Sequence, residues 1–358
     1  MRFSEIEKTL SKKRKLVDGL IEKYLPRTIT QKYIDFLVGK NYGYNQKVLQ
    51  KTIAEPLWNF LDRGGKRWRP ILFALLVEAL GGNNKKVKDF LIIPELIHMG
   101  SLVIDDIEDS SELRRNQKCL HHLFGEDVAI NAGNLVYFLP LITFIKNRDK
   151  FPSEIYQRAY EMYIQEMVNL HLGQAVDIGW HRDIALPKSE EEYYEMTRQK
   201  TGAMARLAVK LAAIFSGLAQ NKVNQIAQIF EKMAVAFQIQ DDILDIDLTG
   251  KSRIKFGKSF GNDIKEGKKT LMVIYVLKKA ELRDKKILLR ILRKHTNNFY
   301  DVSKVVEILK KYKAIDYARQ KAAELINQAK KEISVFFGDN KKSQAIQSLM
   351  DFLISRTY

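Results

Sequence analysis

The sequence predicts an all-α protein, and three observations support this fold class. Apolar residues recur at spacings of three and four along most of the 358 residues, as on the buried face of a helix. No segment shows the alternation of apolar and polar residues that is typical of a strand. Seven prolines and nineteen glycines are few for this length, which favours long uninterrupted helices. We expect a bundle of more than ten helices.

The helical pattern is clearest from Ile155 to Ile178, where apolar side chains form one continuous face. Further helices are expected over 48–61, 70–80, 87–107, 129–146, 190–216 and 223–247, and from Lys269 to the C-terminus, with turns at 81–84, 147–149 and 217–221. No linker rich in proline, glycine or serine divides the chain. We therefore expect one domain over 1–358, with a basic helical extension at 1–45 and lysine-rich helices at 280–358.

Composition limits the class of protein. Hydrophobic residues make up 46% of the chain, enough to bury a large core and to argue against intrinsic disorder. A single cysteine, Cys119, excludes an intramolecular disulfide framework and zinc sites built from cysteine pairs. The longest apolar run, Leu135 to Ile145, is shorter than the roughly 18 residues that a membrane-spanning helix needs. The N-terminal residues lack the apolar stretch of a secretory signal, so we expect a cytoplasmic protein.

The formal net charge of +17 suggests an anionic partner. Nucleic acid, an anionic membrane surface and a polyanionic small substrate are the three classes to consider. Lysines are most frequent in the first 45 and last 80 residues, where a solvated surface is the simplest interpretation and a weak peripheral membrane contact is the alternative.

Two segments, residues 105–109 and 241–245, share the pattern Asp-Asp-x-x-Asp. The first and last aspartates of each segment are four residues apart and lie on one face of a helix, whereas the middle aspartate points about 100° away. The candidate primary metal ligands are therefore Asp105, Asp109, Asp241 and Asp245, and the candidate assisting residues are Asp106 and Asp242.

Carboxylates without histidine or cysteine at a matching spacing favour Mg²⁺, with Mn²⁺ as the alternative. One such segment would be explained more simply as a solvated helix end. Two segments, each following an apolar helical run, favour a pocket with acidic residues at its mouth if the two helices face each other. Basic residues follow both segments and also occur at Gly64–Pro70 and Lys200. Metal ions together with Lys and Arg are what diphosphate groups require, which predicts a diphosphate site and no role in nucleic-acid binding.

These residues resemble the trans-isoprenyl diphosphate (polyprenyl) synthases. The matching motifs are GGKRWRP (64–70), ELIHMGSLVIDDIEDSSELRR (95–115), FGEDVAINAGN (124–134), GQAVDI (173–178), KTGA (200–203), FQIQDDILD (237–245) and GKSFGNDIKEGKKT (257–270). The resemblance implies an isoprenoid synthase bundle of helices around a central cavity. It also implies condensation of isopentenyl diphosphate with an allylic diphosphate, three Mg²⁺ ions per active site and a homodimer.

The resemblance assigns roles to individual residues. It implies metal binding by Asp105, Asp109 and Asp241, with Asp242 and Asp245 assisting through water. It implies binding of the allylic diphosphate by Arg114, Lys200, Lys258 and Lys268, and of isopentenyl diphosphate by Lys66, Arg69, His98 and Arg115. It implies that Thr201 and Gln238, with the carbonyl of Lys200, direct neutral dipoles at the allylic cation.

His98 has a second interpretation as a hydrogen-bonded core histidine. Its position seven residues before Asp105, on the same helix face, favours the ligand role. After Arg115, the chain has Asn116-Gln117-Lys118-Cys119 where the family usually has Gly-x-Pro-Thr, so the geometry of this loop is not inherited from the resemblance. We expect Cys119 to be a buried space-filling residue and not a nucleophile.

Product length is expected to depend on Gly100 and Ser101, five and four positions before Asp105. Aromatic residues at these places form the floor of the family's C15 enzymes. Because glycine and serine leave no such floor, we expect a C20 product, geranylgeranyl diphosphate, or a longer one. Ile97, deeper along the helix, is a candidate for the residue that stops chain growth.

Two other functions compete with chain elongation. A class I terpene cyclase shares the first aspartate segment, but its second metal motif usually contains Asn, Ser or Thr, and Glu at wider spacing. A non-catalytic partner subunit of a heteromeric synthase would tend to lose one of the two aspartate segments, whereas both are present here.

Overall fold

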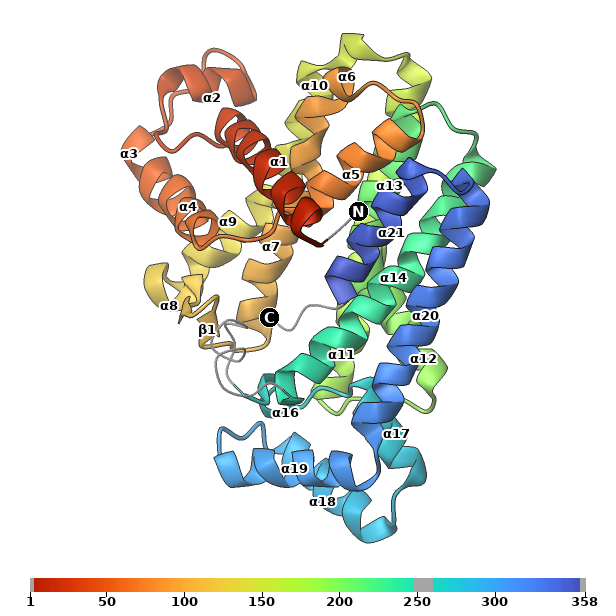
Figure 1. Cartoon of the computed structure of the whole chain (residues 1–358). Coiled ribbons are helices and arrows are strands. Elements are labelled where there is room, and N and C mark those ends of the chain that lie inside the picture. The colour runs from red at the N-terminus through yellow and green to blue at the C-terminus, as the bar shows by residue number, and fades with distance from the viewer. Residues whose placement is uncertain (1–2, 248–259, 355–358) are drawn as a thin grey trace. The chain divides into compact units, whose positions relative to one another are not determined.

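The computed structural model describes residues 3–247 and 260–354, and it is all-α as predicted (Figure 1). The chain forms two compact units. Unit 1 comprises residues 1–160 and 211–219, and unit 2 comprises residues 161–210 and 220–358. The expectation of one domain over 1–358 stays a prediction.

The elements of unit 1 are mostly helical. They are α1 (Phe3–Tyr24), α2 (Gln31–Val38), α3 (Gln46–Leu49), η1 (Gln50–Ala54), α4 (Glu55–Asp62), α5 (Trp68–Ala79), α6 (Asn84–Val87), η2 (Lys88–Leu91), α7 (Ile92–Glu108), β1 (Leu113–Arg114), β2 (Gln117–Lys118), α8 (Leu120–Phe124), α9 (Glu126–Phe138), η3 (Leu139–Leu141), α10 (Ile142–Lys146), η4 (Arg148–Lys150) and the start of α11 (Ser153–His181).

Unit 2 contains most of α11 and the helices that follow it. They are α12 (Glu190–Thr197), η5 (Arg198–Gly202), α13 (Ala203–Phe215), which ends in unit 1, α14 (Gln220–Asp247), α16 (Asn262–Lys265), α17 (Leu271–Lys279), α18 (Leu282–Arg293), α19 (Phe299–Lys311), α20 (Ala314–Phe337) and α21 (Lys341–Ile354). The long helices end within a few residues of the predicted limits, because the apolar periodicity and the turn residues that predict them coincide.

A two-stranded antiparallel hairpin, which the sequence did not predict, follows α7. Leu113 pairs with Lys118 and Arg114 with Gln117. The two residues at its turn, Arg115 and Asn116, have φ values of 54° and 62°. Two successive residues with positive φ are typical of the tight hairpin turn that matches the twist of the strands. Strands of two residues carry no periodic pattern, which explains why the sequence gave no signal for them.

Aromatic side chains fill the core of unit 1 at its α10–α11 end. Phe90, Phe144, Phe151, Tyr156 and Phe215 are in mutual ring contact, with the rings of Phe90 and Phe215 only 4.4 Å apart between centroids. Tilted and edge-on ring pairs of this kind add to the stabilisation that the buried apolar area provides. The cluster fixes the N-terminal end of α7, the helix that carries the first aspartate segment.

Two glycines allow α7 and α9 to pack with their backbones in close approach. A Cβ atom on Gly100 of α7 would lie 2.8 Å from the carbonyl oxygen of Gly133 of α9. A Cβ atom on Gly133 would lie 3.0 Å from the side chain of Ile104. Because neither helix has a side chain at these points, α9 supports the face of α7 that carries Gly100.

In unit 2, α14 packs lengthwise against α20, and α21 packs beside them (Figure 1). The buried residues of α14 include Phe230 and Met233, and those of α20 include Ile326 and Ile333. Burial of such side chains contributes roughly 1.5–3 kcal/mol each. The second aspartate segment lies at the C-terminal end of this well-packed helix.

By length and composition, one helical stretch of the described residues could cross a membrane, Glu126–Lys146. Half of its most apolar window is buried inside the protein, and core helices of soluble proteins meet the same criterion. The buried side of α9 includes Ala132, Val136 and Tyr137.

The close approach of α7 and α9 predicts a steric effect at Gly100. Replacing Gly100 with alanine forces the backbones apart and should lower the free energy of unfolding by about 1–3 kcal/mol, the usual cost of overpacking. Gly19→Ala is the matched control, because Gly19 lies in α1 with no atom within 4 Å of the new methyl group. The control should be neutral or stabilising by up to ~1 kcal/mol, since alanine favours a helix. Equal urea midpoints for the two variants would contradict the packing argument.

Candidate active site

The first aspartate segment occupies the last turn of α7 in unit 1. Asp105 and Asp106 lie in that turn, and Asp109 follows directly, with its backbone N–H donating to the carbonyl of Asp105. The carbonyl end of a helix is an unfavourable place for carboxylates. Neighbouring cations therefore decide which of these groups are stable.

Asp106 is neutralised within the protein. Its carboxylate accepts a hydrogen bond from Nε of Arg114 at 2.8 Å, and its exposed fraction is 1%. Burial opposes the charge on Arg114, but the ion pair with Asp106 outweighs it and raises the pKa of Arg114 above its usual value. Asp105 is further away, 3.9 Å from Arg114. The middle aspartate is thus committed to Arg114, and Asp105 and Asp109 remain the candidate metal ligands.

The loop before α5 brings further arginines close to α7. Arg67 has a left-handed backbone with φ 51°, and its guanidinium donates to Glu95 at 2.9 Å and to Asp18 at 3.0 Å. A Cβ atom on Gly65 would lie 3.0 Å from the guanidinium nitrogens of both Arg67 and Arg115. Only glycine fits where two arginines approach the backbone this closely, which explains Gly65 of the motif.

A cationic group surrounds His98 on α7. Burial, followed by the charges of Arg69, Arg115, Arg114 and Arg67, lowers the pKa of His98 well below its ordinary value. Burial and the neighbouring arginines also lower the pKa of Arg115 to about 10. The guanidinium of Arg69 lies 4.3 Å from the centroid of the Trp68 ring and that of Arg115 lies 5.1 Å from the Phe60 ring. Stacked guanidinium groups with unfavourable mutual repulsion favour binding of an anion.

In unit 2, the middle aspartate of the second segment is also hydrogen-bonded within the protein, in this case by neutral donors. Asp242 accepts hydrogen bonds from the Tyr193 hydroxyl at 2.9 Å and from the Gln238 amide at 2.8 Å. Burial, with the charges of Asp263 and Asp241, raises the pKa of Asp242 well above its usual value. Asp242 therefore orients Gln238 and Tyr193.

Asp245 has a second structural task. Its two carboxylate oxygens accept the backbone N–H groups of Asn262 at 3.0 Å and Asp263 at 3.1 Å. It therefore fixes the start of α16 to the end of α14. Each carboxylate oxygen has a second lone pair, so this bonding is compatible with an assisting role at a metal. Asp241 is half-buried and is the most direct candidate ligand in unit 2.

Lys200 and Thr201 lie on η5, a π-helical turn between α12 and α13. The Lys200 ammonium is 2.6 Å from a carboxylate oxygen of Asp177 on α11, and the Thr201 hydroxyl donates to the Gln238 side-chain oxygen at 2.8 Å. Since the threonine hydrogen is used in this bond, its oxygen presents lone pairs in other directions.

The structure places the remaining candidates as follows. Lys268 is paired with Glu266 at 2.6 Å, and Lys66 is exposed at the start of the GGKRWRP motif. Lys258 lies outside the described residues. Cys119 is buried, and burial raises the pKa of its thiol, as expected for a space-filling residue.

The chain-length candidates on α7 differ in their surroundings. Ile97 is fully buried, and Ser101 is half-buried with its hydroxyl donating to the carbonyl of His98 at 2.9 Å. Gly100 is directed at α9, where a Cβ atom would also lie 2.8 Å from Val136 and 3.2 Å from the Tyr137 ring. The expectation that Gly100 leaves open space beside Asp105 is therefore wrong, because five helical residues rotate it about 140° from that aspartate.

The donor set suits Mg²⁺. Among the described residues, no group of three or more His, Cys, Asp or Glu side chains could hold a metal by itself. Mg²⁺ is usually bound by one or two carboxylates together with water and substrate phosphates. Pairs of aspartates beside cationic groups fit that mode of binding and do not fit an all-protein cage.

Sequence reasoning missed several residues that support these groups. Asp177 pairs with Lys200, Tyr193 donates to Asp242, and Arg206 with Glu166 holds the neighbourhood of η5. Asp177 belongs to the GQAVDI motif and could have been noticed as its one charged residue. The other three are separated widely in sequence from their partners, so no local signal identifies them.

Comparison with known proteins agrees with this arrangement. A family model described as Polyprenyl synthetase matches residues 50–309. The chain belongs to the polyprenyl synthetase family. A short chain isoprenyl diphosphate synthase of Methanothermobacter thermautotrophicus is 33% identical over 311 residues, covering 87% of this chain and 92% of that protein. A geranylgeranyl pyrophosphate synthase of Geoglobus acetivorans is 33% identical over 317 residues, covering 87% and 95%.

The fold agrees with a solved relative in this polyprenyl synthetase family. The crystal structure of geranylgeranyl pyrophosphate synthetase from Pyrococcus horikoshii matches with a TM-score of 0.83 and 28% identity, covering 99% of this chain and 100% of that chain. The chain is accordingly a prenyltransferase of isoprenoid biosynthesis with trans-prenyl diphosphate synthase activity.

The different environments of Asp105 and Asp106 predict different consequences of the same substitution. Asp106→Asn removes the buried counter-ion of the half-buried Arg114 and should destabilise the protein by roughly 3 kcal/mol. Asp105→Asn should leave thermal stability almost unchanged but lower kcat by about a hundredfold or more, as loss of an electrostatic catalytic group does. Thermal denaturation and steady-state kinetics on both variants would check this, and equal loss of stability in the two would count against the assigned pairing.

Proposed function

We propose that the protein condenses isopentenyl diphosphate with an allylic diphosphate in an Mg²⁺-dependent reaction that yields a trans-polyprenyl diphosphate of C20 or longer. The observation that carries the proposal is the bonding of the aspartates: in each segment the protein holds the middle carboxylate with its own hydrogen bonds, and in the first segment Asp105 lies beside the cationic Arg114. Carboxylates in this state are suited to metal ions that also bind a diphosphate.

The reaction breaks the carbon–oxygen bond of the allylic diphosphate and joins its C1 to the terminal alkene carbon of isopentenyl diphosphate. A proton is then lost to form the new double bond. Bound Mg²⁺ neutralises the negative charge that develops on the leaving diphosphate. We assign the holding of those ions to Asp105, Asp109 and Asp241, with Asp242 and Asp245 assisting. Arg114, Lys200, Lys258 and Lys268 orient the same diphosphate.

The cationic group around His98 suits the second substrate. Arg69, Arg115 and Lys66 supply positive charge, and the lowered pKa of His98 keeps its imidazole neutral and able to donate a hydrogen bond. Arg115 has a positive φ, a conformation that costs about 1 kcal/mol or more in a residue other than glycine. We propose that this group binds the diphosphate of isopentenyl diphosphate, whose negative charge relieves the repulsion between the arginines.

Thr201 and Gln238 are suited to stabilise the allylic cation. Both present neutral oxygen atoms, and the hydrogen bonds Thr201 to Gln238 and Gln238 to Asp242 hold them in fixed orientations. A neutral dipole can stabilise a nearby cation without capturing it. The leaving diphosphate is the base that we assign to the final proton loss.

The direct test is an incubation with isopentenyl diphosphate and C5, C10 or C15 allylic primers, followed by sizing of the dephosphorylated alcohols. Products should form with Mg²⁺ and disappear with excess EDTA. Failure to elongate any primer would contradict the proposal, and cyclic hydrocarbons would indicate a terpene cyclase instead.

Product length of C20 is supported by the absence of an aromatic residue at position 101 and by the names of the relatives. Ser101 is half-buried, whereas a Cβ atom at Gly100 would meet the backbone of α9. Ser101→Phe is therefore the substitution that tests the floor, and it should shorten the main product to C15 while preserving overall turnover. Ser101→Thr is the matched control and should leave the product length unchanged. Gly100→Phe would disturb the packing of α7 on α9, so its effect on product length would not test whether an aromatic side chain blocks the growing product. An unchanged C20 product from a folded Ser101→Phe enzyme would refute the role of Ser101.

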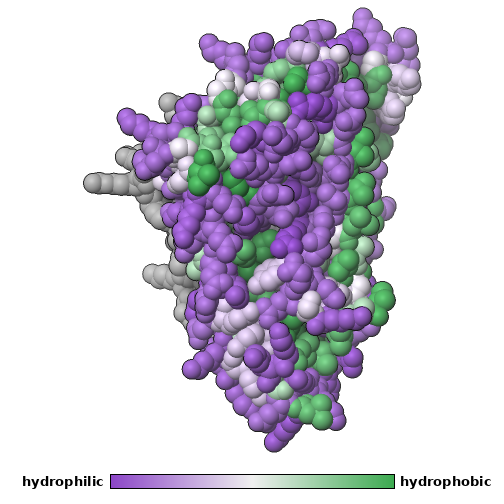
Figure 2. Space-filling view, turned by 90° about the vertical axis from the view of Figure 1, so that its right-hand side faces the viewer, coloured by the Kyte–Doolittle hydropathy of each residue, from purple (hydrophilic) through white to green (hydrophobic). Residues whose placement is uncertain are grey.

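We also propose that the protein is a homodimer. In unit 2, α11 exposes four apolar residues at intervals of four, with exposed fractions of 61%, 52%, 59% and 43%: Ile164, Val168, Leu172 and Val176. Apolar residues also gather in a band along the right-hand edge of the face in Figure 2, whereas the rest of that face is largely hydrophilic. A regular apolar stripe on a soluble helix favours burial against a second copy.

The stripe predicts the effect of a charge at its centre. Leu172→Glu should shift the protein from dimer to monomer, because a carboxylate would be buried without a partner. Val335→Glu is the control, since Val335 on α20 is 81% exposed outside the stripe. Light scattering after size exclusion measures both masses, and a dimeric Leu172→Glu variant would contradict this interface.

A further inference from the structure

The turn η5 presents two adjacent residues to two different helices. Lys200 is paired with Asp177 of α11, and Thr201 is bonded to Gln238 of α14. A regular helix would place neighbouring residues about 100° apart, and the wider π-helical turn changes these directions locally. Turns of this kind are uncommon and often occur at functional sites. The protein must therefore stabilise η5 from outside.

Arg206, two helical turns further along, bonds to the backbone of η5. Its Nη1 donates to the carbonyl of Arg198 at 2.7 Å, and its Nη2 to the Gln199 side-chain oxygen at 3.3 Å. A carbonyl at a π-helical turn lacks its regular α-helical partner. Arg206 supplies that partner from within the same helical segment.

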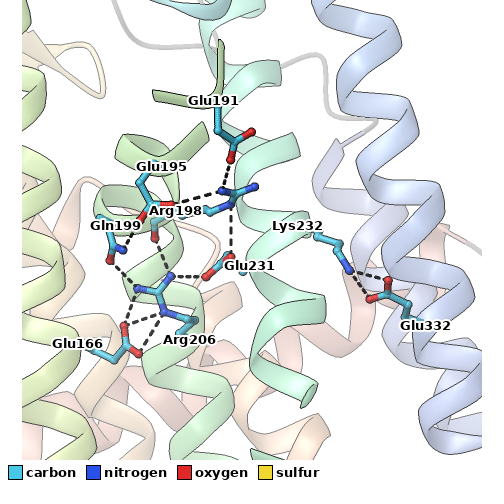
Figure 3. A network of polar contacts seen from close by, with 9 residues as sticks. All are labelled: Glu166, Glu191, Glu195, Arg198, Gln199, Arg206, Glu231, Lys232 and Glu332. Carbon is cyan, nitrogen blue, oxygen red and sulfur yellow. Dashed lines mark hydrogen bonds and ion pairs between the residues drawn. The ribbon is translucent and has the colours of Figure 1, made fainter. Parts of the chain in front are cut away.

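The guanidinium is held by two carboxylates from other helices, as Figure 3 shows. Glu166 of α11 accepts from Nε at 2.9 Å, and Glu231 of α14 accepts from Nη1 at 2.6 Å. Glu166 is 1% exposed and also accepts from Lys210 at 2.6 Å. Burial opposes the charge on Arg206, but these carboxylates outweigh it and raise the pKa of its guanidinium. A fully satisfied buried network of this type fixes one geometry.

Two glycines complete the support of η5. A Cβ atom on Gly173 of α11 would lie 2.3 Å from the backbone nitrogen of Lys200, so α11 packs directly on the turn. A Cβ atom on Gly202 would lie 3.2 Å from Nη1 of Arg206. The turn is thus confined by a helix backbone on one side and by the guanidinium on the other.

We propose that Arg206, through Glu166 and Glu231, is the positioning residue that holds η5 so that Lys200 and Thr201 face the reacting allylic group. The catalytic part of this inference rests on the proposed function. Arg206 itself touches neither substrate. Its removal changes the placement of Lys200 and Thr201 and leaves the binding residues of unit 1 unaltered.

The test compares Arg206→Met with Lys232→Met in the full-length protein. Lys232 is the matched control, because it lies on α14 and forms an ion pair with both oxygens of Glu332, away from η5 (Figure 3). Arg206→Met should lower kcat by about tenfold to a hundredfold, the effect of misplacing catalytic groups by an ångström or less. KM for isopentenyl diphosphate should stay the same. Lys232→Met should leave both constants unchanged, since partly exposed pairs contribute little.

Arg206→Lys tests the same inference with the charge kept. Lysine can reach Glu166 or the Arg198 carbonyl but cannot bond four groups in one plane, so kcat should fall between those of the wild type and Arg206→Met. Glu231→Gln, which keeps the shape of the network, replaces Arg206→Met if that variant does not fold. A folded variant with lower thermal stability but wild-type kcat would overturn the positioning role.

Amide hydrogen exchange separates this inference from the proposed function. Exchange in residues 198–203 should accelerate in Arg206→Met and stay unchanged in Lys232→Met. Unchanged exchange at η5 in Arg206→Met would overturn the inference, whatever the activity. A wild-type enzyme that forms no prenyl diphosphate would contradict the proposed function, while the exchange result would still decide whether Arg206 holds the turn.

Discussion

Repulsion between clustered carboxylates is the constraint on which both aspartate segments depend. The first segment places four acidic side chains, and the second places three, within about one helical turn at the carbonyl end of a helix. The protein reduces this repulsion by bonding the middle aspartate of each segment: Asp106 pairs with the half-buried Arg114, and Asp242 accepts from a tyrosine and an amide. The first aspartate of each segment, Asp105 or Asp241, is the one that we propose as a metal ligand.

In unit 1 a cluster of positive charges is subject to the same kind of repulsion as the clustered carboxylates. Arg115 has a lowered pKa and His98 is neutral, so the protein carries a local excess of positive charge at a cost in stability. Arg67 is different, because Glu95 and Asp18 balance it. Arg67 thus has carboxylate partners within the protein, whereas Arg115 stacks on an aromatic ring and bonds to a carbonyl.

Much of the fold and of the candidate site could be predicted from the sequence, because helix periodicity and motif spacing are local properties. The long helices and the commitment of Asp106 and Asp242 away from the other aspartates follow from angles of 100° per residue. The direction of Gly100 follows from the same angle. Its close approach to the backbone of Gly133 is a tertiary contact, for which the sequence contains no local signal. Arg206 and Glu166 are 40 residues apart, and nothing in either neighbourhood indicates their pairing.

The lysine-rich ends account for much of the net charge, and neither substrate site explains them.

The π-helical turn at η5 has a consequence for how this protein tolerates insertions and deletions. A π-turn contains one residue more than the α-helical turn it replaces, so removing one residue there would restore a regular helix. Because the extra residue is taken up within the turn, α13 beyond it would keep its apolar face toward the core, but the directions of Lys200 and Thr201 within the turn would change. The length of the Arg198–Gly202 segment therefore sets the directions of Lys200 and Thr201, and a one-residue deletion there would alter the candidate site while leaving the packing of α13 in place.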